Sequence, residues 1–464
     1  MHHCVGSYDP MNSPVKPLQY RPFIRGICFF VFSLIGLMPV SVAAQQAEAV
    51  LTVGISGEAV DAHPYGIIAA STGSLGYVAI AGDVTPFGEL VEDYANYRIA
   101  EVDMHSLEVL RTFEVGYFPT ELLLLEGNLY VTCSNDSNLY QIDLATAEVL
   151  SFPMTDSSGF AVTFLSGLVA SSTGSVIVGS NGGNFDGSDE NILVFDPISE
   201  AITQWVTVEG SITRFMEYDG EWVVPVGYPG NDFTAAPVVS WIDAATGTVT
   251  GSVNIAVDTA DFPGPSDITD LGNGTALVTV YGGSAEVFLL DLAKRTLIET
   301  WPLESTDFSQ SAALLLDDGR VLVSDLLGGW MKILDPQNGA LETLATGLSL
   351  PVDLCLKSGR IFATEQGLEQ VAVFSAPGSF VRGDANMDQT VDVSDPIKLL
   401  NYLFLGGDLT CEDAGDANDD GVLDLADAVN VLEFLFAAGS VPTFPFPVGG
   451  SDLLEDDLDC LPGT

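Results

Sequence analysis

An aspartate recurs at nearly regular intervals through most of this chain, each time at the end of a run rich in aliphatic and aromatic residues. The clearest copies, spaced 40, 53, 47, 48 and 44 residues apart, are Asp103, Asp143, Asp196, Asp243, Asp291 and Asp335. Turn residues follow these positions, where an aspartate can accept hydrogen bonds from backbone N–H groups two residues on. Each interval has room for about four short strands, which is the repeat length of a β-propeller blade.

The repeats predict how many blades the propeller has. Six repeat units are complete, and a seventh contains three strands, near Val352–Leu356, Arg360–Thr364 and Gln370–Phe374. The segment Ala49–Gly57 has the pattern of the missing fourth strand. Pairing this segment with the last strand would close the ring and cover an open edge. We therefore expect a mainly β chain with a seven-bladed propeller over residues 45–378, with six or eight blades as alternatives.

The second repeat resembles a known propeller family. Its segments Glu108–Gly116, Phe118–Leu122, Gly127–Val131 and Leu139–Asp143 look like the YVTN/NHL-type repeat. The resemblance extends over about 330 residues, from 45 to 378. It implies a fold that serves as a binding platform in most such proteins and as an enzyme in some, so it specifies fold more than function.

One position of the repeat carries acids in three units. Two residues after the proline that opens a unit lie Gly66, Glu121, Asp267 and Asp353. We expect the three carboxylates to be solvated turn acids of a very acidic protein. The alternative is that they ring the mouth of the propeller channel, where they would form a pocket for a cation, a glycan or a peptide.

Catalytic signals in the propeller are weak. After residue 44 the only histidines are His63 and His105, which excludes a zinc site built from a histidine cluster. Hydrolysis or elimination would need a pair of carboxylates, for which Asp267 and Asp353 are candidates. The sequence thus leaves the ligand of the propeller unknown and favours a non-catalytic role.

The first 44 residues have the pattern of a signal peptide. Arg21 and Arg25 precede the apolar run Gly26–Val40, and small residues at Val42–Ala44 offer a cleavage site. The run of 15 residues is short for a membrane-spanning helix. We expect a secreted or cell-surface protein with no membrane span after cleavage, and an uncleaved anchor is the alternative.

Charge and cysteine content narrow the classes of partner. The chain has 14 Lys and Arg against 64 Asp and Glu, a formal net charge of -50, which disfavours nucleic-acid binding. Export permits disulfides, and Cys411 and Cys460 are the expected pair. Cys133 and Cys355 lie in predicted strands and are expected as buried free thiols.

Two 12-residue segments near the C-terminus have the ligand spacing of a calcium loop. The first offers side-chain oxygens at positions 1, 3, 5, 9 and 12 and a backbone carbonyl at position 7, from Asp384, Asn386, Asp388, Asp392, Asp395 and Thr390. The second repeats this pattern 32 residues later, with Asp416, Asn418, Asp420, Asp424, Asp427 and the carbonyl of Val422. Calcium prefers six to eight oxygen ligands, so we predict two bound Ca²⁺ ions.

Each loop is followed by an apolar helical pattern, Pro396–Phe404 and Ala428–Phe436. A loop with its following helix, occurring twice, resembles a type I dockerin over residues 382 to about 440. The resemblance implies a small all-α calcium-binding domain over residues 379–464 that docks to a cohesin-like or scaffold protein, and it suggests a polysaccharide-degrading system by association. Gln389 departs from the family's glycine at position 6, so the first site should be the weaker one.

Three functional hypotheses follow. The first is a secreted calcium-binding protein that attaches through its C-terminal module and binds a ligand with its propeller. The second is a carbohydrate-active hydrolase or lyase with a catalytic propeller. The third is a structural protein of the cell envelope or matrix.

Overall fold

The computed structural model describes residues 45–53, 63–81, 97–181, 190–208, 210–229, 235–255, 264–281, 286–303, 312–388, 390–447, 449–450, 458 and 460. The predicted signal peptide and Gln389 lie outside the described residues.

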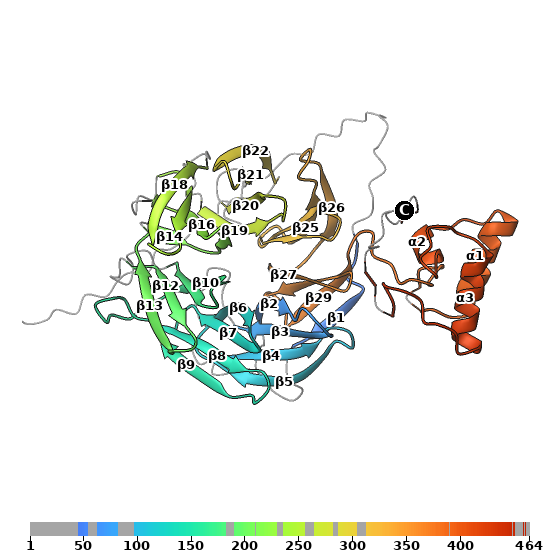
Figure 1. The fold of residues 1–464 in the computed structure, drawn as a ribbon, viewed down its shortest axis with the longest axis horizontal. Coiled ribbons are helices and arrows are strands. Elements are labelled where there is room, and N and C mark those ends of the chain that lie inside the picture. Colours follow the sequence, from blue (N-terminus) through green and yellow to red (C-terminus); the bar gives the residue numbers. More distant parts are fainter. Residues whose placement is uncertain are drawn as a thin grey trace, which may run out of the picture. The chain divides into compact units, whose positions relative to one another are not determined.

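The chain forms seven antiparallel sheets arranged as the blades of a propeller (Figure 1). The first blade contains β2 (Pro64–Ala69), β3 (Leu75–Ile80), β4 (Arg98–Asp103) and β5 (Glu108–Glu114). The second contains β6 (Pro119–Leu125), β7 (Asn128–Cys133), β8 (Asn138–Asp143) and β9 (Val149–Pro153). The third contains β10 (Leu165–Ala170), β11 (Val176–Ser180), β12 (Ile192–Asp196) and β13 (Ala201–Val206). The fourth contains β14 (Ser211–Ile212), β15 (Met216–Tyr218), β16 (Glu221–Gly227), β17 (Val238–Asp243) and β18 (Thr248–Asn254). The fifth and sixth contain β19 (Gly264–Asp270), β20 (Thr275–Tyr281), β21 (Glu286–Asp291) and β22 (Thr296–Pro302), then β23 (Ala313–Leu315), β24 (Val321–Asp325), β25 (Trp330–Leu334) and β26 (Leu341–Thr346).

The seventh blade joins the two ends of the propeller sequence. It contains β27 (Pro351–Lys357), β28 (Arg360–Glu365), β29 (Gln370–Ser375) and β1 (Ala49–Thr52) in spatial order β1-β29-β28-β27. β1 pairs antiparallel with β29, with Ala49 opposite Val373. The N-terminal strand therefore closes the ring from the segment that the sequence indicated, and the count of seven blades is confirmed.

The core lies between neighbouring blades. One cluster of buried side chains combines Leu51 of β1 and Phe362 of β28 with Val102 of β4, so it joins the seventh blade to the first. The innermost strands approach closely, as Gly66 illustrates, because a Cβ atom there would lie 2.0 Å from the carbonyl oxygen of Thr120. Glycine is required at this contact because no side chain fits.

The recurring aspartates stabilise the turn between the third and fourth strands of a blade. The Asp103 carboxylate accepts backbone N–H bonds from His105 at 2.8 Å and from Ser106 at 2.9 Å. The hydrogen bond from Ser106 is the main cause that lowers the pKa of Asp103. The periodic signal in the sequence is therefore a local turn signal repeated from blade to blade.

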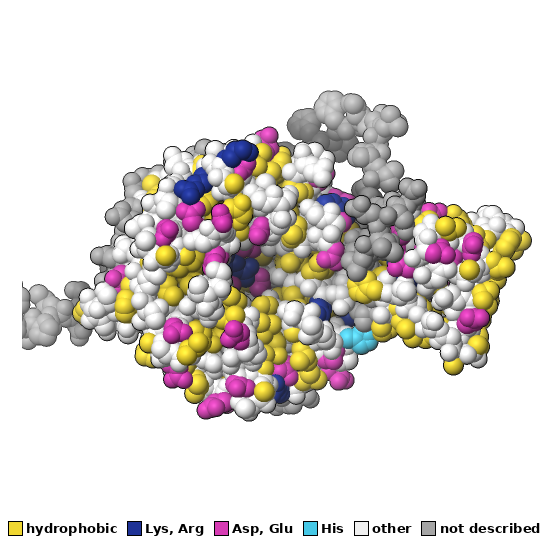
Figure 2. All heavy atoms as spheres, viewed as in Figure 1, with side chains coloured by type: hydrophobic (Ala, Val, Ile, Leu, Met, Phe, Trp, Pro, Cys, Tyr) yellow, Lys and Arg dark blue, Asp and Glu magenta, His cyan; other side chains and the backbone are white. Residues whose placement is uncertain are grey.

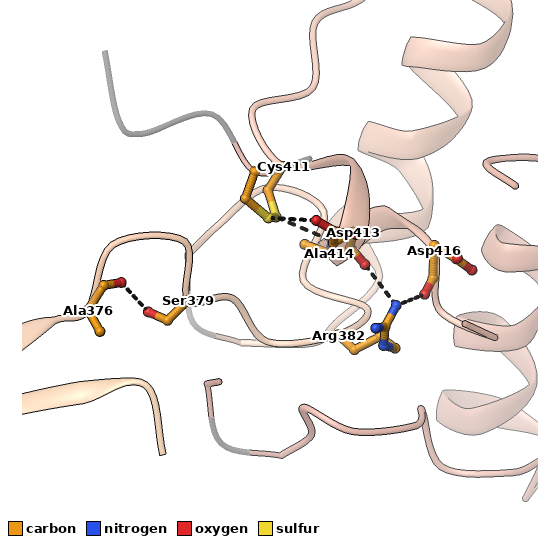
Figure 3. Close-up of a disulfide and its surroundings, with 8 residues drawn as sticks. Ala376, Ser379, Arg382, Cys411, Asp413, Ala414 and Asp416 are labelled. Atoms are coloured by element: carbon orange, nitrogen blue, oxygen red, sulfur yellow. Dashed lines mark hydrogen bonds between the residues drawn. A yellow bond between two sulfur atoms is a disulfide. The ribbon is translucent and has the colours of Figure 1, made fainter. Parts of the chain in front are cut away.

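The described residues after the propeller contain three helices, α1 (Ser394–Leu405), α2 (Glu412–Gly415) and α3 (Leu425–Phe436). α1 and α3 follow the two predicted calcium loops, and they pack around Leu399, Leu409 and Ala428. A disulfide joins Cys411, the N-cap of α2, to Cys460 (Figure 3). The helix α2 was not predicted from the sequence, because it is only four residues long. None of the helices in the described part of the chain has the length and apolar character needed to span a membrane.

Candidate functional site

The three predicted channel acids meet at the propeller axis, where all three bind one arginine. Arg214 lies between β14 and β15 of the fourth blade. Its Nε donates to the two carboxylate oxygens of Glu121 at 3.0 and 3.1 Å. Nη1 reaches Asp267 Oδ2 at 3.3 Å, and Nη2 reaches Asp353 Oδ1 at 2.8 Å. We call Arg214, Glu121, Asp267 and Asp353 the axial cluster. Figure 2 shows basic and acidic side chains together in the hollow at the centre of the ring.

Backbone groups of further blades extend the axial cluster. Asp353 Oδ2 accepts the N–H of Ile67 in the first blade at 2.9 Å. Asp267 Oδ2 accepts the N–H of Ala313 in the sixth blade at 2.8 Å. The four charged residues come from blades two, four, five and seven, so six of the seven blades contribute to one network.

The acids of the axial cluster are not solvated turn residues, because Asp267 and Asp353 are buried. Burial raises the pKa of Asp267, and the Arg214 guanidinium opposes that rise. Burial also raises the pKa of Glu121, and the nearby Asp353 and Asp267 carboxylates raise it further. One guanidinium faces three carboxyl groups, so the cluster keeps a formal excess of negative charge.

A cavity of about 370 Å³ lies beside the axial cluster. The axial cluster forms part of its polar lining, together with Thr269 and Asp270. The rest of the wall is largely apolar, including Ile67, Leu122, Leu168, Phe215, Ile268 and Leu354. Most of the accessible surface inside the cavity is polar, unlike that of the mostly apolar pockets that usually hold small molecules. The propeller therefore has a polar cavity with room for a ligand.

The predicted calcium loops fold around their first and last aspartates. In the second loop, Asp416 accepts backbone N–H bonds from Asp419 at 2.9 Å and from Gly421 at 2.8 Å. Asp427 accepts the N–H of Asp424 at 2.9 Å and of Asn418 at 3.4 Å. Asp416 and Asp427 are both fully buried. Burial, together with the adjacent Asp416 carboxylate, raises the pKa of Asp427 to about 6.

The first loop repeats this arrangement. Asp395 accepts the N–H of Asp392 at 2.7 Å and of Asn386 at 3.2 Å, which matches the pattern around Asp427. Asp384 accepts the N–H of Asp388 at 3.1 Å. Asp384 and Asp395 are buried, and burial raises the pKa of Asp395.

The remaining predicted ligand positions lie nearer the surface. In the first loop, Asp388 Oδ1 accepts the N–H of Thr390 at 3.0 Å, and in the second loop Asp420 Oδ1 accepts that of Val422 at 3.1 Å. The side chain of Asp424 accepts the N–H of Ala426 at 2.6 Å and caps α3.

The second loop has a buried oxygen whose surroundings suit a metal ligand. The side-chain oxygen of Asn418, at loop position 3, is buried and has no hydrogen-bond partner among the described residues. Buried polar atoms normally have a partner. An unpartnered amide oxygen beside two buried carboxylates is an oxygen-only donor set, which suits a hard cation such as Ca²⁺.

The helices that follow the loops leave large apolar side chains exposed. Three pairs, each related by the 32-residue repeat, are Val393 and Leu425, Ile397 and Val429, and Phe404 and Phe436. Phe404 is 66% exposed and Phe436 is 72% exposed. Figure 2 shows hydrophobic side chains gathered over these helices. We call these six residues the apolar pairs.

Comparison with known proteins supports the propeller fold. No protein-family model matches the sequence, and no curated protein matches it. Hydrazine synthase of Kuenenia stuttgartiensis superposes with a TM-score of 0.55 at 14% identity, covering 70% of this chain and 99% of that one. A streptogramin B lyase superposes with a TM-score of 0.54 at 13% identity, covering 70% and 96% of the two chains. The WD40 domain of Neurospora crassa Pan2 gives 0.51 at 10% identity, covering 68% and 90%. At these identities the similarity shows the fold alone.

Sequence reasoning missed Arg214, although it found the three acids. The acids stand at one position of the repeat, whereas Arg214 follows a short strand in the fourth blade, whose innermost strand is divided into β14 and β15. The usable signal is the scarcity of basic residues, of which the chain has 14. A lone arginine among so many acids is a strong candidate for the centre of a charge cluster.

Proposed function

We propose that this protein is a secreted, calcium-binding attachment protein, whose C-terminal module docks to a partner protein while its propeller binds a separate ligand. The observation that carries the proposal is the second loop, where Asp416 and Asp427 are buried side by side and the Asn418 oxygen lacks a partner. Two adjacent buried carboxylates are costly unless a cation compensates their charge.

The ligands for the two ions would be the residues of the repeated loops. Asp384, Asn386, Asp388, Asp392 and Asp395 with the Thr390 carbonyl would hold the first ion, and Asp416, Asn418, Asp420, Asp424 and Asp427 with the Val422 carbonyl the second. Bound calcium supplies the positive charge that each ring of acids lacks. Backbone N–H groups within each loop donate hydrogen bonds to its first and last aspartates, and these bonds hold the loop in its folded shape.

The apolar pairs support docking as the role of the module. Exposed apolar side chains that gather in one area of a surface are typical of protein interaction sites. The pairs repeat with the loops, so calcium and the docking surface belong to the same structural unit. The surrounding segment is acidic, and Lys398 is the only basic residue of α1 and α3. A partner with an apolar patch and a basic rim would complement it, and we propose a cohesin-like domain of a scaffold protein.

The propeller is proposed as the ligand-binding part, with the axial cavity as one place for a glycan or peptide. The enzyme alternative gains no support from the acids that were candidates for a catalytic pair. Asp267 and Asp353 bind Arg214 and backbone N–H groups, so both already have partners. We therefore propose ligand binding, rather than catalysis, as the role of the propeller.

A docking experiment on the full chain tests this function. The immobilised protein is exposed to a panel of purified cohesin domains in calcium and in chelator. We expect binding that chelator abolishes and that the double substitution Ile397→Asp with Val429→Asp removes. The control is Ile198→Asp, which changes a side chain 95% exposed on a propeller turn. No binding to any cohesin, or binding that survives both the chelator and the double substitution, would overturn the docking proposal.

A further inference from the structure

Arg382 is fully buried, which is unusual for an arginine in such an acidic segment. It lies two residues before the first calcium loop, yet its guanidinium contacts the second. Nη1 donates to the backbone oxygens of Asp416 at 2.8 Å and Asp413 at 3.2 Å, as Figure 3 shows. Nη2 forms an ion pair with Asp419 Oδ1 at 2.7 Å. One side chain thus contacts the first and fourth residues of the second loop.

The same arginine also binds the segment that follows α3. Arg382 Nε donates to the backbone oxygen of Phe444 at 2.9 Å, and its backbone N–H donates to Pro445 at 2.6 Å. In the same segment, the ring of Phe446 contacts the ring of Phe434 on α3, with centroids 5.2 Å apart. We call residues 442–447 the tail. Arg382 therefore connects the start of the first loop, the second loop and the tail.

The ion pair fixes a strained point of the second loop. Asp419 has a left-handed backbone with φ of 61°, a conformation that costs a non-glycine residue free energy. Met387, its counterpart in the first loop, has φ of 62° and is exposed to solvent. Position 4 is not one of the predicted ligand positions, so the Asp419 carboxylate is available to Arg382. The second loop is therefore held by an ion pair at a position where the first loop has none.

We propose that Arg382 is a positioning residue that holds the second loop in its calcium-binding conformation and couples that loop to the tail. This inference rests on the proposed calcium binding. Holding a loop in its bound conformation removes part of the ordering cost of binding. The backbone adds a second link, since the N–H of Gly383 donates to Ala414 at 2.8 Å, just before the second loop. Loss of Arg382 should therefore weaken the second site and loosen the tail together.

The test is a calorimetric calcium titration of the full chain, with hydrogen exchange of the backbone amide at position 382 as a second readout. This amide donates to the Pro445 carbonyl, so its exchange reports on the tail and is called tail exchange. An Asp395→Asn background disables the first loop, so that the second is measured alone. In that background we expect Arg382→Met to weaken calcium binding at least tenfold and to speed tail exchange. Arg382→Lys should have a calcium affinity between those of the parent chain and Arg382→Met, because lysine keeps the positive charge but not the planar set of donors. Asp419→Asn should weaken binding in the same direction.

The matched control is Lys398→Met, which removes the other basic side chain between residues 382 and 437. Its contact with Asp408 is 3.4 Å long and exposed, so calcium binding and tail exchange should be unchanged. Asp419→Asn preserves the shape of the side chain, so it remains informative if Arg382→Met prevents folding of the module. Wild-type affinity in both Arg382→Met and Asp419→Asn would overturn the role of Arg382. No calcium uptake by the parent chain would instead contradict the proposed function itself.

Discussion

At the scale of residues, two arginines organise groups that are far apart in the sequence. Arg214 brings three acids from three blades to the propeller axis, and Arg382 connects a loop, a short helix and the tail. The guanidinium group suits this role because it offers five donors in a rigid planar arrangement. Both contacts join distant positions, and neither is visible as a local pattern in the sequence.

Replacing Arg214 should destabilise the propeller strongly. Arg214→Met leaves Glu121, Asp267 and Asp353 without their cation, and breaking a buried ion pair costs about 3–5 kcal/mol. Burial already raises the pKa of Glu121 and Asp267. An acid whose pKa is higher in the folded protein than in the unfolded chain destabilises the fold as the pH rises and the acid ionises. The free energy of unfolding that Arg214→Met removes should therefore be larger at pH 8 than at pH 5. Thermal unfolding at both pH values measures the effect.

The matched control for Arg214 is Arg295→Met. Arg295 pairs with one carboxylate, that of Glu221 at 2.7 Å, and has no buried acid partner comparable to Asp267 and Asp353, so the expected cost is about 0–1 kcal/mol. Equal losses for the two variants, or a loss at Arg214 that does not change with pH, would contradict a central role for the axial cluster.

The two free cysteines of the described propeller should be inert in the folded protein. Cys133 and Cys355 are buried, and burial raises the pKa of Cys355 to about 12. Because the thiolate is the reactive form, a charged alkylating reagent at pH 8 should label neither residue until the protein is denatured. Mass spectrometry of the labelled peptides gives the result, and rapid labelling of either cysteine in the native chain would show that these strands open.

At the scale of elements, closure of the ring depends on one short strand. β1 supplies the outer strand of the seventh blade, and it is separated by more than 300 residues from its partner β29. Its side chains alternate, with Leu51 fully buried and Val50 42% exposed. Without β1, β29 would be an open edge, which is a site for aggregation.

Substitutions at two neighbouring residues of β1 compare its buried face, which packs into the core between the first and seventh blades, with its exposed face. Leu51→Ala removes a side chain from the core between the first and seventh blades, and we expect a loss of about 2–5 kcal/mol. Val50→Ala changes the exposed face of the same strand and should cost about 0.5 kcal/mol. Chemical denaturation of both variants gives the comparison. Similar small losses for both would mean that β1 contributes little to closing the ring.

The sequence predicted local elements well and distant contacts only in part. The recurring aspartates mark turns, and the apolar runs before them mark strands, because both signals act within a few residues. The acids of the axial cluster were found from their position in the repeat, but their burial and their shared arginine were not. Arg214 lies between the two parts of the divided inner strand in the fourth blade, away from the repeat position that carries the acids. The helix α2 was missed because one turn carries no periodicity.

At the scale of the whole molecule, the dominant property is negative charge. With 64 acidic and 14 basic residues, the chain repels itself unless cations or burial compensate its acids. Arg214 supplies that compensation at the axis of the propeller. In the C-terminal module the loop acids outnumber the basic residues, and we propose that bound calcium compensates their charge.

The number of calcium ions that the chain retains is the sharpest test of the two proposed calcium sites. Equilibrium dialysis in 0.15 M potassium chloride with excess magnesium suppresses loose binding to surface acids. We predict two calcium ions per chain. Changing both Asp416 and Asp427 to Asn should reduce this number to one, and changing both Asp384 and Asp395 to Asn should also reduce it to one. No retained calcium, or retention that neither double substitution reduces, would contradict it.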